Sequence, residues 1–472
     1  MTVFRTFRQQ RSIRLFLAAA VAPVLAAAVV AAPSARAAAS DDIRINEVVS
    51  TGNVNDSIEL YNKGAAAVDV SGWILKDNNN SSKFKIAAGT TILPGGFKAF
   101  DVHGSFGLGS SDSARLYLAD GSTLVDSFTW TQHSNVSWSR CSDGTGAFKQ
   151  SAAVSLDAPN VCGAPAAVAW PGGSAVSTAD AANVFGTDLS GLYQEGSVLW
   201  GAQNSGSLWR LVPNGSGGWT PDTANGWGAG KALHFPGGSG TPDDEGVTLT
   251  GSGSVSGGVF VSTERDANAS GTSRLSVLRY DVTGSGTSLS ATREWNLTSD
   301  LPAVDSNLGL EGITWVPDSA LTAGGFKDVS TGAAYDPARY GAHTGGVFFV
   351  GVEATGMVYG YVLLEAGGFT RVAAFSTGMP AVMELQFEPQ TSRLWAVCDN
   401  TCSGQHRTLR IDATGVFGVT AVYNRPSGMS NYNNEGFSLA GADQCVGGTK
   451  PVYWSDDSND GSHALRKGTV NC

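Results

Sequence analysis

The sequence predicts an all-β protein, in which a β-sandwich of about 100 residues is followed by a β-propeller. After residue 40, short runs of Val, Ile, Phe, Tyr, Trp and Thr alternate with clusters of Gly, Ser, Asn and Asp, and 61 of the 472 residues are glycine. This alternation is typical of β-strands joined by tight turns. In addition, a short phrase, Glu-Gly followed by an apolar run, recurs through the C-terminal part of the chain.

The first 39 residues differ in composition from the rest and predict a secretory signal peptide. Four arginines precede an apolar run from Leu15 to Ala32, and the small-residue site Ala35-Arg36-Ala37 follows. A transmembrane anchor is the alternative, but the Ala and Pro content of the run and the small-residue site favour cleavage. No later segment is apolar enough to span a bilayer. We therefore expect a secreted, extracellular protein with no membrane span after signal cleavage.

Charge and cysteine content limit the partners. Cleavage would remove five arginines and no acidic residue, which changes the formal net charge from −11 to −16. Such an acidic chain repels phosphate backbones, so we expect no nucleic acid partner. Divalent cations are the more suitable binding partners for this charge. The six cysteines suit an oxidising compartment. Neighbours in sequence predict the disulfides 141–162, 398–402 and 445–472, with a metal thiolate site at Cys398, Cys402 and His406 as the alternative.

Residues 40–150 form the predicted sandwich, with strands expected at 43–49, 57–62, 68–75, 97–102, 114–118 and 124–130. Four phrases carry a resemblance to the lamin tail domain: Ile45-Asn46-Glu47, Ile58-Glu59-Leu60-Tyr61-Asn62, Val70-Ser71-Gly72-Trp73 and Leu93-Pro94-Gly95. The resemblance implies an immunoglobulin-like sandwich that serves as an accessory module. We expect Trp73 to lie in the core, and Glu47 and Glu59 to bind backbone or arginine groups rather than to catalyse.

Residues 151–165 are rich in Ala, Ser and Pro and predict a linker. Residues 166–472 contain the repeat, whose phrases begin at Ser190, Glu245, Glu311, Glu384 and Glu435. A second apolar run follows each phrase and ends in polar residues, namely Asn204, Glu264, Glu353, Asp399 and Asp456-Asp457. Units of this length with four strands each predict a β-propeller. Five blades are expected, with 166–186 supplying the strand that closes the ring; six blades and a two-sheet sandwich are the alternatives.

The repeated glutamates Glu245, Glu311, Glu384 and Glu435 are the main candidate site. The first strand of each propeller blade lines the central channel, so these side chains are expected to converge near the axis. A pair of carboxylates about 6 Å apart repels by roughly 3 kcal/mol at an effective dielectric near 20. Either protonation or a bound cation relieves this repulsion. All-oxygen ligands favour Ca²⁺ over Zn²⁺. The alternative is that each glutamate accepts backbone N–H bonds between blades, with no ion.

A second candidate for calcium is the turn Asp456-Asp457-Ser458-Asn459-Asp460-Gly461, which has the D-x-S-x-D-G form of a calcium loop. Its ligands would include Asp456 and Asp460. Lys467 stands where an EF-hand has its twelfth, acidic ligand, so the turn is not an EF-hand. A solvated turn without an ion is the alternative.

The Glu-Gly blade starts and the acidic ends of the second runs resemble two propeller families, the phytase-like esterase domain and the SdiA-regulated group. The resemblance implies a calcium-bearing propeller that hydrolyses phosphoesters or esters. Cationic candidates for a phosphate are Arg265, His343, His406, Arg407 and Lys450, by position only. A non-catalytic propeller that binds cell-envelope or polymer ligands is the other class of function. The sequence contains no G-x-S-x-G elbow, H-E-x-x-H or P-loop, and it leaves enzyme status, ligand and oligomeric state open.

Overall fold

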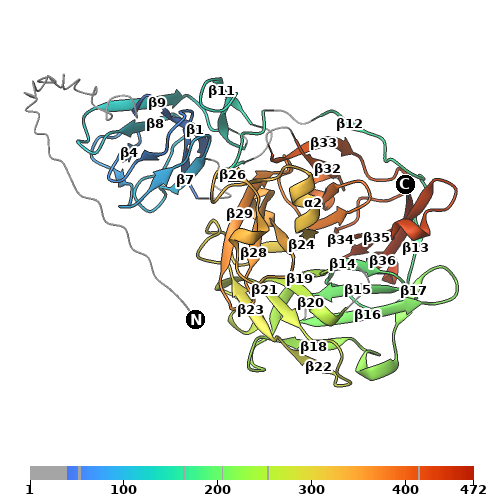
Figure 1. Ribbon diagram of the computed structural model, residues 1–472. Coiled ribbons are helices and arrows are strands. Elements are labelled where there is room, and N and C mark those ends of the chain that lie inside the picture. The colour runs from blue at the N-terminus through green and yellow to red at the C-terminus, as the bar shows by residue number, and fades with distance from the viewer. Residues whose placement is uncertain are drawn as a thin grey trace, which may run out of the picture.

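A computed structural model describes residues 40–50, 55–134, 136–151, 154–162, 165–204, 206–251, 255–412 and 415–472. The chain folds into two β-rich parts, with the N-terminal one beside the larger C-terminal one (Figure 1). A short helix, α2 (Asp318–Ala323), follows β24. Among the described residues, no helix has the length and apolarity needed to cross a membrane. The predicted signal peptide lies outside the described residues.

The N-terminal part is a sandwich of two antiparallel sheets, as predicted. One sheet has the order β11-β10-β1-β2-β7 and the other β5-β4-β8-β9, with a small ladder of β3 and β6 beside them. The strands are β1 (Ile43–Val49), β2 (Ser57–Asn62), β3 (Val68–Asp69), β4 (Ile74–Lys76), β5 (Phe84–Lys85), β6 (Thr91–Ile92), β7 (Phe97–Asp101), β8 (Asp112–Tyr117), β9 (Leu124–Trp130), β10 (Trp138–Cys141) and β11 (Ala147–Gln150). Ile45, Leu60, Leu75 and Leu116 are fully buried between the sheets, and Trp73 lies in the same core, as expected.

In the described residues the C-terminal part contains five sheets of four or more strands, each built mainly of strands that follow one another in the chain, and one two-stranded hairpin. The first sheet has β14 (Leu189–Glu195), β15 (Val198–Gln203), β16 (Ser207–Pro213), β17 (Trp219–Pro221), β18 (Lys231–His234) and β22 (Ser288–Ser290). The second has β19 (Pro242–Leu249), β20 (Val259–Asp266), β21 (Ser273–Tyr280) and β23 (Arg293–Asn296). The third has β24 (Leu310–Pro317), β27 (Gly346–Val352), β28 (Met357–Leu363) and β29 (Phe369–Ser376), near a hairpin of β25 (Lys327–Asp328) and β26 (Ala333–Ala334).

The fourth sheet has β12 (Ala167–Val168), β30 (Glu384–Glu388), β31 (Arg393–Val397), β32 (His406–Ile411) and β33 (Phe417–Tyr423). The fifth has β13 (Ser177–Thr178), β34 (Asn434–Leu439), β35 (Thr449–Asp456) and β36 (Leu465–Asn471). The first strands of the sheets contact one another in the cyclic order β14, β19, β24, β30, β34 and back to β14. This closed ring of inner strands is the arrangement of a β-propeller.

The segment that follows the linker closes this ring. β13 pairs antiparallel with β36, the last strand of the chain, and β12 pairs parallel with β33. Trp170 lies between them in sequence and packs against Trp395 and Trp454, while its indole N–H donates to the Thr469 carbonyl at 2.8 Å. The prediction that 166–186 supplies the outer strand of the last sheet is therefore confirmed.

The repeated phrase forms a β-bulge. The strand register shifts at Asp244/Gly246 in β19, between Leu310 and Ile313 in β24, and between Asn434 and Gly436 in β34. Glycine is needed because a Cβ at position 246 would lie 2.7 Å from the Glu311 carbonyl oxygen on the next inner strand. The bulge re-aims the preceding glutamate. In β30 no such shift occurs, and Leu385 stands in place of glycine.

All three predicted disulfides are present: Cys141–Cys162, Cys398–Cys402 and Cys445–Cys472. With Cys398 and Cys402 paired, the alternative thiolate metal site would require reduction of this disulfide. The disulfides suit an extracellular protein.

Candidate cation site at the mouth of the propeller

The mouth of the propeller is the end at which first strands begin and second strands end. Because these strands are antiparallel neighbours, the bulged glutamate of one and the polar end of the other lie close together. Glu245 of β19 thus approaches Glu264 of β20, and Glu311 of β24 approaches Glu353, which directly follows β27. The sequence prediction was that the repeated glutamates converge with one another near the axis, whereas here each of these two glutamates meets the acidic end of a second strand.

Two groups of three carboxylates result. Asp243, Glu245 and Glu264 have oxygen atoms that all lie within 4.8 Å of one another, and Glu264, Glu311 and Glu353 satisfy the same limit. Both triads share Glu264. All of these side chains except Glu353 are buried. Glu353 is partly exposed and begins a 3₁₀ turn, Glu353–Thr355. We call these five residues the carboxylate cluster.

Few protein groups neutralise the cluster. Arg265 pairs with Asp243 at 2.6 Å, the Asn204 amide donates to Glu245 at 3.0 Å, and the Gly309 N–H donates to Glu264 at 2.6 Å. Glu311 is only 5% exposed, yet in the described part of the chain no N–H, O–H or cationic group binds its carboxylate. A buried carboxylate in this state is costly when charged.

Burial and mutual repulsion raise the pKa values of the cluster. Desolvation is the largest cause for Glu311, whose pKa lies well above its ordinary value, and Glu245 and Glu264 add to it. The pKa of Glu264 rises to about 8, because burial outweighs the Gly309 hydrogen bond. Burial and then Asp399 raise the pKa of Glu353 to about 7. Protons or a bound cation would therefore stabilise the cluster at neutral pH.

Glu435 is joined to the cluster by a hydrogen-bond network rather than by direct contact. The Ser190 hydroxyl lies 2.9 Å from a Glu435 oxygen and also contacts the Asn204 side-chain oxygen, and its single proton serves one of the two at a time; the Asn204 amide in turn donates to Glu245. On its other side Glu435 accepts from Asn433 at 3.0 Å. The first sheet, in which serine replaces the repeated glutamate, thus supplies neutral groups between two acidic ones.

Glu384 adopts the alternative arrangement. It is fully buried and its carboxylate accepts N–H bonds from Leu192 of β14 at 3.0 Å and from Leu385 at 2.9 Å. The amides of Ile313 and Phe437 also favour its charged form, although burial as the largest effect raises its pKa. Glu384 therefore ties inner strands of different sheets together across the axis. The structure does not bring it into either triad.

Asp456 and Asp460 also lie apart from the cluster. The Asp456 carboxylate binds Arg466 at 2.9 Å and accepts the Asp460 N–H at 2.9 Å. Asp460 is exposed, and its carbonyl oxygen accepts from the same arginine. The turn is thus held by Arg466, which binds both the Asp456 carboxylate and the Asp460 carbonyl oxygen.

The cationic candidates have different surroundings. His406 is buried, accepts the Trp454 indole N–H at 2.8 Å, and has its pKa lowered to about 3 by desolvation. Lys450 forms a buried pair with Glu388 at 2.7 Å, and His343 binds Asp318 at 3.0 Å. Arg407 donates to the Thr377 carbonyl. Arg265 alone among the five contacts the carboxylate cluster in the described structure.

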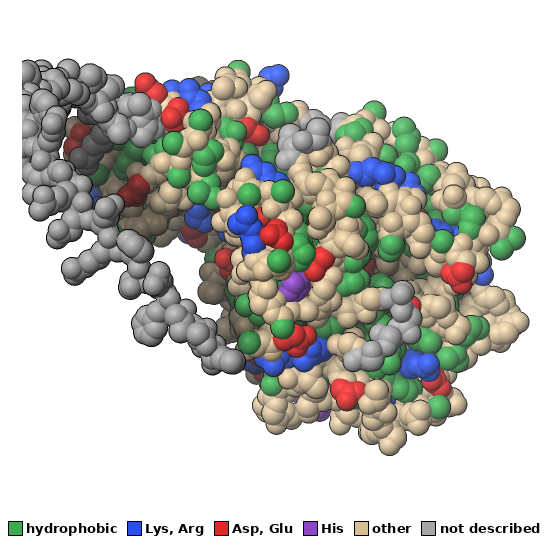
Figure 2. Space-filling model, in the orientation of Figure 1, with side chains coloured by type: hydrophobic (Ala, Val, Ile, Leu, Met, Phe, Trp, Pro, Cys, Tyr) green, Lys and Arg blue, Asp and Glu red, His purple; other side chains and the backbone are tan. Residues whose placement is uncertain are grey.

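The sequence prediction omitted Asp243, Glu264 and Glu353 from the site. Glu264 and Glu353 could have been found, since both end second apolar runs, and antiparallel pairing puts those ends beside the repeated glutamates. Asp243 carries no comparable signal. By contrast with the cluster, the face shown in Figure 2 has acidic and basic side chains scattered among neutral ones.

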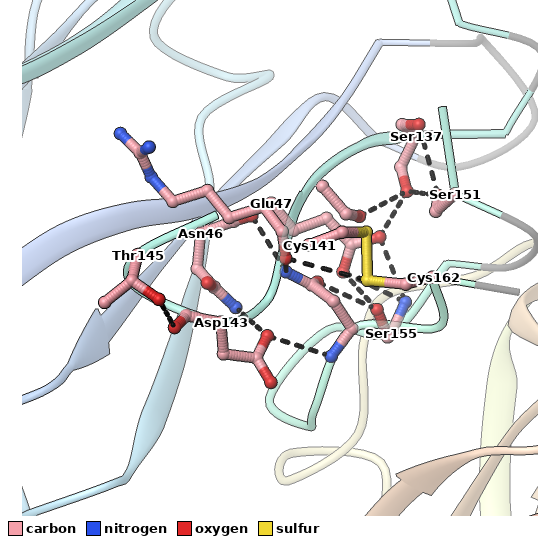
Figure 3. The surroundings of a disulfide bond; sticks show 12 residues. Asn46, Glu47, Ser137, Cys141, Asp143, Thr145, Ser151, Ser155 and Cys162 are labelled. Atoms are coloured by element: carbon pink, nitrogen blue, oxygen red, sulfur yellow. Dashed lines mark hydrogen bonds between the residues drawn. A yellow bond between two sulfur atoms is a disulfide. The ribbon is translucent and has the colours of Figure 1, made fainter. Parts of the chain in front are cut away.

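Buried carboxylates of the sandwich hold the segment after it. Glu47 accepts bonds from the Ser155 N–H and hydroxyl groups, the latter at 2.8 Å, and from the Ser137 hydroxyl (Figure 3). Glu59 accepts the Asp157 N–H at 2.5 Å. The disulfide Cys141–Cys162 lies beside this network (Figure 3). Glu47 and Glu59 thus bind backbone, as expected, and they bind the segment that joins the two parts of the chain.

Comparison with known proteins supports the N-terminal assignment. A family model of the lamin tail domain matches residues 36–132. No curated protein matches the chain. Among solved structures, the luciferin-regenerating enzyme is similar at 11% identity, with 63% of this chain and 95% of that chain covered and a TM-score of 0.30. A protein described as a 6-phosphogluconolactonase, from Bacteroides uniformis ATCC 8492, is similar at 12% identity, with 82% and 98% covered and a TM-score of 0.28. Scores this low carry no argument about function.

Proposed function

We propose that the propeller binds a divalent cation, Ca²⁺, in the carboxylate cluster, and that the bound ion engages an oxygen-rich ligand at the mouth. The observation that carries the proposal is Glu311, a buried carboxylate among other carboxylates, to which the described residues offer no hydrogen-bond donor or cation. A cation would supply the missing charge. The donor set consists of carboxylate oxygens, which suits Ca²⁺ better than Zn²⁺.

We infer further that the ligand is an ester or phosphoester that the protein hydrolyses. A bound cation polarises a carbonyl or phosphoryl oxygen and stabilises the charge that develops on it. Among the described residues, the carboxylate cluster at the mouth has one basic partner, Arg265, whereas a binding propeller for neutral polymers would have a neutral, aromatic mouth. Asn204 and the Gly309 N–H orient Glu245 and Glu264 for this role. A non-catalytic binding propeller for cell-envelope or polymer ligands is the second candidate, which the same cation would serve.

The cation is tested by thermal unfolding in calcium and in chelator. We expect Ca²⁺ to raise the unfolding temperature of the wild type, because it binds the folded state alone. Glu311→Gln keeps the shape and removes one charge, so it should weaken this response and stabilise the protein in chelator. Glu365→Gln, at a partly exposed glutamate that pairs with Arg279, is the matched control and should respond to calcium like the wild type. A wild type that shows no calcium shift would contradict the proposal.

Catalysis is tested separately with a panel of phosphate monoesters, phosphate diesters and carboxylic esters. We expect calcium-dependent hydrolysis in at least one class, abolished by chelator and reduced in Glu311→Gln. Calcium binding without turnover of any class would leave the cation site standing and favour the binding propeller.

A further inference from the structure

We propose that a cavity between the sandwich and the propeller binds a small organic acid, that is, a carboxylate joined to an apolar body. The cavity lies where the turn 93–96 of the sandwich meets the hairpin of β25 and β26 (Figure 1). Segment 154–162 and β29 of the third propeller sheet contribute to its walls. The described walls include no residue of the carboxylate cluster, so the inference is independent of the proposed cation site.

The size and the place of the cavity suit a small ligand. Its volume is about 290 Å³. Ligand cavities have volumes of roughly 300–1,000 Å³ and occur preferentially between domains. The cavity is therefore at the lower end of this range, which favours a small molecule over a polymer chain.

Much of the wall is apolar. The sandwich contributes Ile92, Leu93 and Pro94, and the propeller contributes Val329 and Val416. The Val329 side chain is 41% exposed, unlike most large apolar side chains of the described chain, which are buried. A ligand with an apolar body would remove this surface from water, which is favourable.

The charged groups of the wall favour an anion. They are two cationic side chains, Lys327 and Arg371, and one acidic side chain, Asp157. The wall is thus net positive in a chain whose formal net charge is −11. In the described structure no carboxylate pairs with the Lys327 ammonium group. The neighbouring Asp328 is buried and accepts a bond from Ser330 instead.

Lys327 is held so that its ammonium group lies beside the sandwich. The Lys327 N–H donates to the Gly415 carbonyl at 2.8 Å, and the Val329 N–H donates to the Val372 carbonyl at 3.0 Å. These bonds fix the hairpin to the fourth and third sheets. The Lys327 Nζ atom lies 3.9 Å from the place that a Cβ atom would take on Gly95. The ammonium group therefore reaches from the propeller to the turn of the sandwich.

Arg371 offers further donors. Its Nε lies 3.5 Å from an Asp300 oxygen and its Nη2 lies 3.7 Å from an Asp157 oxygen, while Nη1 donates to the Asp300 carbonyl at 3.3 Å. The guanidinium has more N–H groups than these contacts use. The Asp157 carboxylate is itself engaged by the Ala99 N–H at 2.6 Å. A carboxylate in the cavity can therefore receive charge-assisted hydrogen bonds from both cations.

The charge of the wall also selects among anions. Its two cations and one acid leave a single positive charge, which a carboxylate balances. A phosphate monoester carries about −1.5 to −2 at neutral pH and would leave negative charge uncompensated. Inorganic anions and acetate lack an apolar body that could cover Val329 and its neighbours. The inferred ligand class is therefore a monocarboxylic acid with an aliphatic or aromatic body.

Titration calorimetry of the full chain with hexanoate tests the site. We expect one hexanoate per chain, bound equally in calcium and in chelator. Lys327→Met keeps the apolar stem and removes the charge, so it should weaken binding by about tenfold or more, whereas Lys327→Arg should retain it. Lys83→Met, at an exposed lysine of the sandwich outside the cavity, is the control and should bind like the wild type. Val329→Trp, at an exposed position, should fill the cavity and abolish binding.

A set of related probes tests the ligand class in the wild type. Hexanol has the same body without the charge, hexyl phosphate has more charge, and acetate has almost no body. We expect hexanoate to bind at least about tenfold more tightly than each of these. Hydrogen exchange should slow in residues 91–97 and 327–332 when hexanoate is bound.

The outcomes that would overturn the inference are distinct. No binding of hexanoate by the wild type would overturn the site, and so would slower exchange confined to other segments. Hexanol binding as tightly as hexanoate would overturn the role of the cations, and tighter binding of hexyl phosphate would overturn the carboxylate class. Unchanged affinity in a folded Lys327→Met variant would remove Lys327 from the site. The readings on the wild type hold even where a variant fails to fold.

Discussion

Glu311 and Glu384 occupy equivalent places in the repeat but have different surroundings. Glu311 precedes a glycine within a bulge and faces other carboxylates. Glu384 precedes Leu385, lies in a regular ladder, and accepts backbone amides. The glycine therefore decides the role, because it permits the bulge that turns the side chain toward the mouth. A carboxylate that accepts backbone amides stabilises the fold, whereas a carboxylate without such donors is available to coordinate a cation.

We predict that Glu384→Gln destabilises the propeller equally with and without calcium. Its carboxyl group accepts N–H bonds through both oxygens, whereas an amide offers only one acceptor oxygen and adds donors where donors already point. The expected loss is about 1–3 kcal/mol in the free energy of unfolding. Urea unfolding in calcium and in chelator measures it. A calcium response that shrinks as it does in Glu311→Gln would instead place Glu384 among the ion's ligands.

Glu47 predicts a pH dependence in the sandwich. Burial, the largest effect, raises the pKa of Glu47 to about 7 from an ordinary value of 4.5, despite bonds from Ser137 and Ser155. The folded state thus holds a proton that the unfolded state has released between these pH values. By linkage, stability falls as the pH rises from about 4.5 to 7, by on the order of 3 kcal/mol.

We predict that Glu47→Gln flattens this dependence, since an amide does not titrate. The measurement is the unfolding free energy of wild type and variant in calcium from pH 5 to pH 8, so that the propeller contributes equally to both. The wild type should lose more stability than the variant across the interval. Parallel curves would show that Glu47 does not hold a proton in the folded protein.

At the scale of elements, the described segment 154–162 contacts both the sandwich and the propeller. Ser155 and Asp157 are bound by Glu47 and Glu59 of the sandwich. The Asp157 carboxylate accepts the Ala99 N–H at 2.6 Å and lies 3.7 Å from Arg371 of the third propeller sheet. Ala158 is buried in the core of that sheet. This segment therefore helps to join the two parts, and residues 91–97 of the sandwich also lie beside residues 327–332 of the propeller.

We predict that Asp157→Ala weakens the attachment of segment 154–162 to the sandwich and to the propeller. It removes an acceptor for the Ala99 N–H and leaves Arg371 with Asp300 as its remaining acidic partner. Limited proteolysis should then cleave within 154–162 faster than in the wild type, by about tenfold if one buried bond of about 1.4 kcal/mol is lost. Asp41→Ala, at an exposed position of the sandwich, is the control. Cleavage at an unchanged rate would show that Asp157 does not hold the segment.

The sequence predicts elements better than it predicts contacts between distant ones. The Glu-Gly phrases locate the inner strands of three sheets because glycine is required where inner strands approach closely. The polar ends of second runs locate Glu264 and Glu353. The partners of Glu47 and Glu384 could not be predicted, since their donors are backbone amides such as Ser155 and Leu192, which carry no side-chain signal. The linker predicted at 151–165 likewise gives no sign that Asp157 reaches Arg371.

At the scale of the whole molecule, the propeller depends on a closure made by residues far apart in the chain. The first strands after the linker pair with β33 and β36, and Cys445–Cys472 fixes the C-terminal end to the same sheet. The strands at the start and at the end of the propeller are therefore paired with each other, and we call the pairing of β12 with β33 and of β13 with β36 the seam of the ring. Opening the ring at this seam would expose the apolar faces of the fourth and fifth sheets.

Trp170 is the largest side chain at this seam, and we predict that Trp170→Ala costs the propeller about 3–5 kcal/mol. The residue is 7% exposed, its ring centre lies 4.9 Å from that of His406 and 5.5 Å from that of Trp454, and its indole N–H binds the Thr469 carbonyl. The alanine variant leaves a cavity and an unpaired carbonyl, whereas Trp170→Phe keeps most of the volume and should cost less. Denaturant unfolding of both variants gives the two free energies. A loss below about 1 kcal/mol in the alanine variant would mean that the ring stays closed without this contact, and that the seam depends on β12 and β13 alone.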